Sequence, residues 1–304
     1  MSGFLLSMLG AASQGVLWGV MVLGVYITYK ILDVADLTVD GSFALGGCVC
    51  ATLVVGAGWN PILALLMSFI AGLLAGAITG FLHTVFEIPA ILAGILTMIS
   101  LWSINLRIMG GKSNIPLLKL TTVFSWIVDR TGLKQAQAAL VIGVVVAIFL
   151  IAALYWFFGT ELGAAIRATG DNEDMVRALG VNTKRTKLLG LMISNGLVGL
   201  SGGLVCQSQK YGDINMGTGA IVIGLASIVI GGVIMGRLRS FNNKLSSAVV
   251  GAVVYFLIRA IVLRLGMDAN DMKLLSAVIV AFALWIPAAS AKWRTKRSYS
   301  EGRF

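Results

Sequence analysis

Ionisable and metal-binding side chains are scarce in this chain of 304 residues. It has one histidine, three cysteines and 12% charged residues, whereas soluble domains carry about 25% charge. With a single histidine and no Cys-x-x-Cys pair, the sequence offers no ligand set for a zinc site. We therefore expect no metal, no cofactor and no enzymatic reaction carried out by the chain itself.

The cysteines and prolines are too few to shape the fold. The cysteines lie in apolar runs, where we expect buried small residues rather than a disulfide framework. Proline breaks helices, and here it falls at the boundaries of apolar runs, in a connection, or at the end of the last run. The three cysteines are Cys48, Cys50 and Cys206, and the four prolines are Pro61, Pro89, Pro116 and Pro287.

Apolar residues, in contrast, make up 58% of the chain, and the mean hydropathy is +0.93. Repeated apolar stretches of roughly 20 residues predict membrane-spanning helices. We therefore predict an all-α integral membrane protein, one transmembrane domain over 1–304 with about nine spans (eight to ten). The predicted spans are approximately 4–28, 42–58, 62–84, 90–109, 137–158, 188–206, 219–236, 245–263 and 273–289.

Positive charge predicts the orientation of these spans. The net charge is +10, and cytoplasmic loops of membrane proteins collect Lys and Arg, which accounts for the charge without nucleic acid. Most Lys and Arg fall on one side, above all in the loop 160–187 and the tail 290–304. We predict a cytoplasmic C-terminus with a basic tail over 290–304, and nine spans then place the N-terminus outside.

Glycine is abundant, with 37 residues, and part of it is regularly spaced. Gly72, Gly76 and Gly80 form a small-residue face at four-residue intervals, and Gly199 and Gly203 repeat the pattern. Such faces let helix backbones approach closely in lipid. We expect tight helix packing at both places.

Carboxylates are missing from the centres of the predicted spans. Asp33, Asp36 and Asp40 cluster where the first span ends and the second begins. Proton and sodium relays use acidic residues inside the membrane, so this distribution argues against an ion pump. An ion-coupled secondary transporter of a small polar solute remains the alternative function.

Residues 111–113 partly match a nucleotide-binding motif. Gly111-Lys112-Ser113 matches the end of the phosphate-binding loop Gly-x-x-x-x-Gly-Lys-Ser, but Leu106 stands where its first glycine is required. The motif also needs a preceding strand in a soluble fold. We reject it, so the chain is expected to lack an ATP-hydrolysing domain of its own.

The loop 160–187 is dense in charge between two apolar runs. We expect two short helices, Leu162 to Arg167 and Asn172 to Leu179, with Gly170 and Gly180 bounding the second and acidic residues near its start, where they suit the helix dipole. A short helix fixed between two spans can dock on a soluble partner; a solvated amphipathic linker is the other interpretation. The charged residues are Glu161, Arg167, Asp171, Glu173, Asp174, Arg177, Lys184, Arg185 and Lys187.

Residues 170–182, Gly-Asp-Asn-Glu-Asp-Met-Val-Arg-Ala-Leu-Gly-Val-Asn, resemble the cytoplasmic coupling segment of ABC importer permeases of the branched-chain amino acid and ribose type. Gly170, Asn172, Gly180 and Asn182 match that segment, while Val176 stands where alanine is usual. Residues 36–42 (Asp-Leu-Thr-Val-Asp-Gly-Ser), 88–98 and 217–232 resemble further family blocks in the same order.

The resemblance also implies a branch within the family. The predicted layout lacks the extra N-terminal span of the ribose permeases and so resembles the amino-acid branch. The string Leu-Thr-Val-Asp-Gly-Ser-Phe is similar to a subgroup whose permeases accompany binding lipoproteins for aromatic amino acids or similar small solutes.

What the resemblance implies is a bacterial cytoplasmic-membrane permease, surrounded by lipid, that catalyses no reaction. Two copies form the pore, cytoplasmic ABC ATPase subunits dock on the loops 160–187, and an extracytoplasmic solute-binding protein delivers the solute.

Three groups of candidate residues follow. Polar side chains on apolar spans are candidates for lining the translocation path, although each can instead form hydrogen bonds with the backbone of a neighbouring helix. Residues 36–42 form either a broken-helix element near the pore or a simple inner turn. The candidates are, for ATPase coupling, Arg167, Gly170, Asn172, Glu173, Ala178, Leu179 and Gly180; for the translocation path, Thr97, Ser100, Asn105, Ser194, Asn195 and Ser201; and for the pore-proximal loop, Asp36, Asp40 and Ser42.

Overall fold

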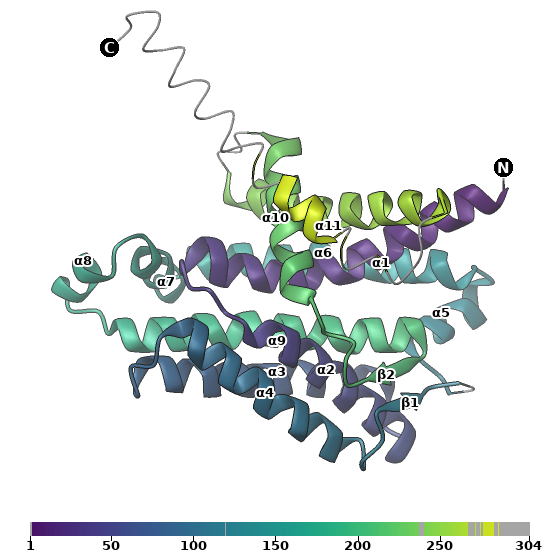
Figure 1. Cartoon of the computed structure of the whole chain (residues 1–304), viewed down its shortest axis with the longest axis horizontal. Coiled ribbons are helices and arrows are strands. Elements are labelled where there is room, and N and C mark those ends of the chain that lie inside the picture. Colours follow the sequence, from purple (N-terminus) through teal and green to yellow (C-terminus); the bar gives the residue numbers. More distant parts are fainter. Residues whose placement is uncertain are drawn as a thin grey trace, which may run out of the picture.

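The computed structural model describes residues 2–118, 120–236 and 240–266, together with 271, 274, 276–282 and 285. Its elements are almost all helical (Figure 1). In chain order they are α1 (Ser2–Tyr26), the π-helical turn η1 (Ile27–Ile31), α2 (Thr38–Gly56), α3 (Pro61–Thr84), α4 (Ala90–Ile108), β1 (Asn114–Pro116), α5 (Val123–Thr131), α6 (Gln135–Gly159), α7 (Glu161–Asp171), α8 (Glu173–Ala178), α9 (Thr183–Gln209), β2 (Tyr211–Asp213), α10 (Ala220–Met235) and α11 (Phe241–Arg264).

The all-α membrane class is confirmed. Seven of the described helices are long and apolar enough to cross a bilayer: α1 with η1, α2, α3, α4, α6, α9 and α11. The predicted segment 219–236 corresponds to α10, which has 16 residues and is shorter than the roughly 20 that a span needs. Of the ninth predicted span, 273–289, residues 276–282 are helical. The basic tail 290–304 lies outside the described residues, and the orientation stays a prediction.

α9 lies at the centre of the bundle, with α1 on one side and α2 and α3 on the other (Figure 1). Glycines make these contacts close. A Cβ added at Gly46 would collide with the Gly199 backbone, and one at Gly72 or Gly76 would collide with carbonyl oxygens of α9. The small-residue faces therefore pack helix backbones against each other, as predicted.

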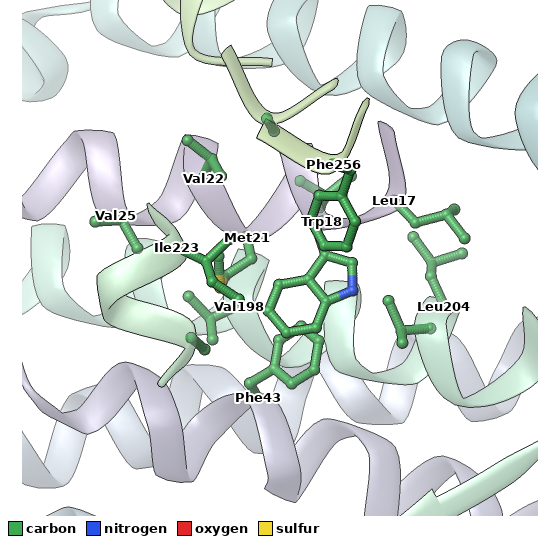
Figure 2. Close-up of a cluster of buried hydrophobic side chains, with 14 of the residues drawn as sticks. Leu17, Trp18, Met21, Val22, Val25, Phe43, Val198, Leu204, Ile223 and Phe256 are labelled. Atoms are coloured by element: carbon green, nitrogen blue, oxygen red, sulfur yellow. The ribbon is translucent and has the colours of Figure 1, made fainter. Parts of the chain in front are cut away.

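Aromatic side chains join α1, α2 and α11 beside this centre. Trp18 lies between Phe43 and Phe256, with ring centroids 4.5 Å and 5.5 Å away, and Figure 2 shows the three rings in line. Leu17, Met21 and Val198 complete the surrounding apolar cluster. Trp18 thereby connects α1 to both α2 and α11.

The two ends of the bundle differ. One end, here called the loop end, carries α7 and α8. The other, the strand end, carries the antiparallel pair β1–β2, in which Asn114 faces Asp213. From β2 the chain turns back into the bundle along α2, because Gly212 packs on Ala51 and Gly217 on the Asp40 carbonyl. α10 therefore begins inside the bundle, at the level of the first turn of α2.

Candidate functional site

The loop 160–187 folds as two short helices, and asparagines define its breaks. The Thr160 hydroxyl accepts from the Gly163 backbone N–H at 3.3 Å at the start of α7. The Asn172 side chain ends α7 and begins α8, where its Oδ1 accepts from Met175 N at 2.9 Å. Asn182 does the same for α9 through Arg185 N at 3.2 Å. Such side-chain caps satisfy backbone donors that a helix start leaves free.

Gly170 was expected to mark the start of α8, and this is wrong. Gly170 lies in the last turn of α7, where its missing side chain lets the backbone approach the Ile31 carbonyl of η1. Asn172 makes the break instead. Gly180 does end the second helix, with φ +85° and no atom within 4 Å of an added Cβ, so it is needed for its left-handed backbone.

Charged and hydroxyl groups tie this loop to α9. Glu173 receives hydrogen bonds from Lys187 and, at 2.9 Å, from Arg177. The Lys187 hydrogen bond holds the pKa of Glu173 below its ordinary value. The Thr169 and Thr186 hydroxyls lie 2.9 Å apart. Together with the Gly170 contact, these links connect the loop to η1 and to α9.

Within α8 and at its C-terminal cap, one apolar side chain is buried and two are exposed. Val176 is 2% exposed, whereas Met175 is 49% and Leu179 74% exposed. Asn172 and Ala178 are exposed as well. An exposed apolar pair on a surface helix, rimmed by charge, is a feature of protein interaction sites.

Arg167 lies on the side of α7 that faces Phe241 at the start of α11, rather than on the outer surface of the loop. Its guanidinium carbon is 5.5 Å from the centre of the Phe241 ring, and with Lys30 and Lys244 it lines a cavity of about 280 Å³. The Nε of Arg167 is buried and has no hydrogen-bond partner among the described residues. The structure therefore separates Arg167 from the exposed coupling candidates.

A buried polar network joins the 36–42 segment to α9. Asn195 Nδ2 donates to Asp36 Oδ2 at 2.7 Å, and its Oδ1 accepts from the Ser42 hydroxyl at 2.7 Å. Asp36 Oδ1 accepts from Thr38 N at 2.9 Å. Asp36 was expected at the edge of the first span, but its carboxylate is 3% exposed and reaches Asn195 near the middle of α9. Residues 32–37 therefore run as non-helical backbone that buries Leu32, Val34 and Asp36 and exposes Asp33 and Ala35.

The hydroxyl candidates make backbone contacts. Ser194 donates to the Gly24 carbonyl and Ser201 to the Leu17 carbonyl, each at 2.8 Å, which ties α9 to α1. Thr97 and Ser100 donate to carbonyls one turn earlier in α4. For Ser194, Asn195 and Ser201, which are 0% exposed, this geometry matches the alternative role of satisfying neighbouring groups.

Asn105 and Asp40 both line another cavity, of about 350 Å³, between α2, α4 and the segment after β2. Asp40 accepts from Gly219 N at 2.8 Å and from Ile221 N at 2.9 Å, which holds the start of α10. Trp102, Asn215 and Thr218 line the same cavity. These three were not anticipated, because an exposed tryptophan on an apolar helix and a short polar connection carry no motif of their own.

Comparison with known proteins identifies the family. The sequence model described as "Branched-chain amino acid transport system / permease component" matches residues 7–284. The chain belongs to this permease family.

The permease has relatives in several bacteria. It is 40% identical over 269 residues to the tyrosine transport system permease protein of Clostridioides difficile, covering 88% of this chain and 87% of that protein. It is 31% identical to the autoinducer 2 import system permease protein LsrC of Shigella flexneri, covering 67% of this chain and 58% of LsrC. It is 26% identical to the inner membrane ABC transporter permease protein YjfF of Escherichia coli K12, covering 70% and 64%. No solved structure matches.

Family membership and the seven apolar helices make the chain a multi-pass permease of the bacterial cytoplasmic membrane. It is a transport component of the ABC class, as the resemblance of residues 170–182 and the three further blocks indicated.

Proposed function

We propose that this permease is the transmembrane subunit of an ATP-driven importer for an amino acid with an aromatic side chain. The observation that carries the proposal is the structure of the loop 160–187. It exposes Met175 and Leu179, which a partner can contact, and its other side is bonded to α9 and packed on η1. A cytoplasmic ATPase is the proposed partner, and two permease copies form the pore to which an extracytoplasmic binding protein delivers the solute.

Force from the ATPase has a defined route in this proposal. A partner that binds Met175 and Leu179 moves α8, and the ion pair between Glu173 and Lys187 transmits that movement to the start of α9. Gly170 passes the motion of α7 to η1 and so to α1. Because α1 and α9 are packed at the centre of the bundle, the loop moves core helices as rigid bodies.

The solute class rests on the relative from Clostridioides difficile. Identity of 40% over 87% of a tyrosine transport system permease protein supports an aromatic amino acid as the solute. The resemblance of residues 37–43 to permeases that accompany aromatic-amino-acid binding lipoproteins supports the same assignment.

The decisive experiment is ATP hydrolysis by the permease reconstituted with its ATPase, with and without the solute-loaded binding protein. We expect hydrolysis to rise when the loaded binding protein is added, and a panel of amino acids then identifies the solute. An ATPase that neither binds nor responds to the loaded binding protein contradicts the proposal.

An ion-coupled secondary transporter is the second candidate, because Asp36 puts a carboxylate inside the bundle. Both of its oxygens accept hydrogen bonds from the protein, which favours a structural role. Uptake driven by an ion gradient in liposomes without any ATPase would support this candidate instead.

A further inference from the structure

The cavity between α2 and α4 contains an unexplained buried amide. Asn105 is 1% exposed, lies in the cavity wall, and has no hydrogen-bond partner for Nδ2 or Oδ1 among the described residues. Leaving a buried polar group unpaired destabilises a protein, so native proteins rarely keep one without a reason. A solute that displaces the groups covering this amide and pairs with it supplies that reason.

The same cavity has one fixed charge. Asp40 is the sole ionisable side chain among the described residues that line it. Its oxygens accept the Gly219 and Ile221 N–H groups and a further backbone hydrogen bond from Ala220, while an ionised carboxylate has about four acceptor positions. Asp40 can therefore accept one more hydrogen bond from a cation, and no lysine, arginine or histidine in the described lining competes for it.

An aromatic surface completes the lining. Trp102 is 48% exposed and offers its ring to the cavity side of α4. Indole faces stack on other rings and attract cations. Met98 and Ile99, one turn earlier on α4, extend the apolar part of the wall.

Polar groups of the connection between β2 and α10 also border the cavity. Asn215 and Thr218 are exposed, lie on this non-helical segment, and line the cavity. The wall therefore combines these polar groups with the apolar residues of α4.

We propose that this cavity is a solute-binding site for a protonated primary amine attached to an aromatic group. Asp40 binds the ammonium, Trp102 packs against the ring, and Asn105 pairs with the remaining polar group of the solute. This inference rests on the proposed function and deepens it, because it assigns recognition of the solute to the permease as well as to the binding protein.

Direct binding to the permease–ATPase complex in lipid nanodiscs, without binding protein, tests the site. The probes are L-tyrosine, tyramine and 3-(4-hydroxyphenyl)propionate, which lacks the amine. We expect both amines to bind and the propionate to bind at least about tenfold more weakly, because a charge-assisted hydrogen bond is worth about 1.5–3 kcal/mol.

Two variants and one control locate the site. Asn105→Leu should weaken binding of tyrosine about tenfold without lowering the melting temperature, because it removes an amide that has no partner among the described residues. Asp40→Asn should abolish the preference for the amines. Trp156→Phe, on an exposed tryptophan of α6 outside the cavity lining, should bind like the unmodified protein.

The outcomes separate this inference from the proposed function. Equal binding of the amines and the propionate, or unchanged binding by Asn105→Leu, overturns the site. If the loaded binding protein still stimulates ATP hydrolysis in that case, ATP-driven import stands without it. Amine-selective binding that Asn105→Leu weakens, without any stimulation, supports the site and removes the ATP-driven proposal.

Discussion

Two asparagines in this permease are equally buried and are used in opposite ways. Asn195 is 0% exposed and makes hydrogen bonds to Asp36, Ser42 and the Leu191 carbonyl. Asn105 is 1% exposed and has no partner among the described residues. The difference teaches that burial of a polar residue in a membrane helix does not reveal its role: the hydrogen-bond partners do.

The largest expected effect comes from replacing each of the two asparagines, one at a time, by leucine. Asn195→Leu leaves the Asp36 carboxylate and the Ser42 hydroxyl without a main partner, so we expect a loss of about 3 kcal/mol or more in stability. Asn105→Leu should be neutral or slightly stabilising. Thermal unfolding of both variants in the same detergent measures the contrast, and an equal loss would show that Asn105 is paired in the folded protein.

A second contrast compares the two loop glycines. Gly170→Ala drives a methyl group into the Ile31 carbonyl, so we expect displacement of α7 and loss of ATP-dependent uptake. Gly180→Ala meets no atom within 4 Å and is strained only by its φ of +85°, at a cost of about 1 kcal/mol. ATPase co-purification and uptake are the measurements. Similar effects of the two variants would mean that the contact with η1 transmits nothing.

A third test sharpens the assignment of the exposed pair on α8. Met175→Ser with Leu179→Ser should reduce co-purification of the ATPase by at least about tenfold, because a protein interface depends on its few apolar anchors. The melting temperature of the isolated permease should not change, since both side chains are exposed. Leu118→Ser is the matched control, because Leu118 is 68% exposed and lies just after β1, at the strand end. Undiminished co-purification of the double variant would exclude α8 as the docking helix.

The smallest expected effect concerns pH. The pKa of Glu173 is lowered mainly by Lys187, so its ion pair stabilises the fold above the unfolded-state pKa, and this contribution is lost as pH falls through the lower folded-state pKa. With 31% of the side chain exposed, screening limits the effect to under about 1 kcal/mol. Glu173→Gln should therefore lower the melting temperature slightly at pH 7, and the difference should vanish once the pH lies below the lowered folded-state pKa of Glu173. A difference that persists in acid would point to packing instead of charge.

Much of the fold could be predicted from the sequence, because apolar length alone determines a span. Eight of the nine predicted segments coincide with a described helix, and the glycine faces meet their partners as expected. α10 could not be recognised as a shortened helix, since its apolar residues fill a span-like window and only Asp40 shows where it begins. The site was harder to predict: Ser194, Asn195 and Asn105 look alike in sequence, and their roles depend on partners 153 to 170 positions away or on the absence of a partner among the described residues.

The position of α10 has a consequence for how the chain is synthesised. A helix of 16 residues is about 24 Å long at 1.5 Å per residue, less than the roughly 30 Å of hydrocarbon in a bilayer. As α10 emerges from the ribosome it cannot complete a crossing by itself. Its first turn is held by a carboxylate made 179 residues before Gly219, and its face packs on α11, which is made after it. Membrane insertion of this segment must therefore be completed late, when helices made both earlier and later are in place to receive it.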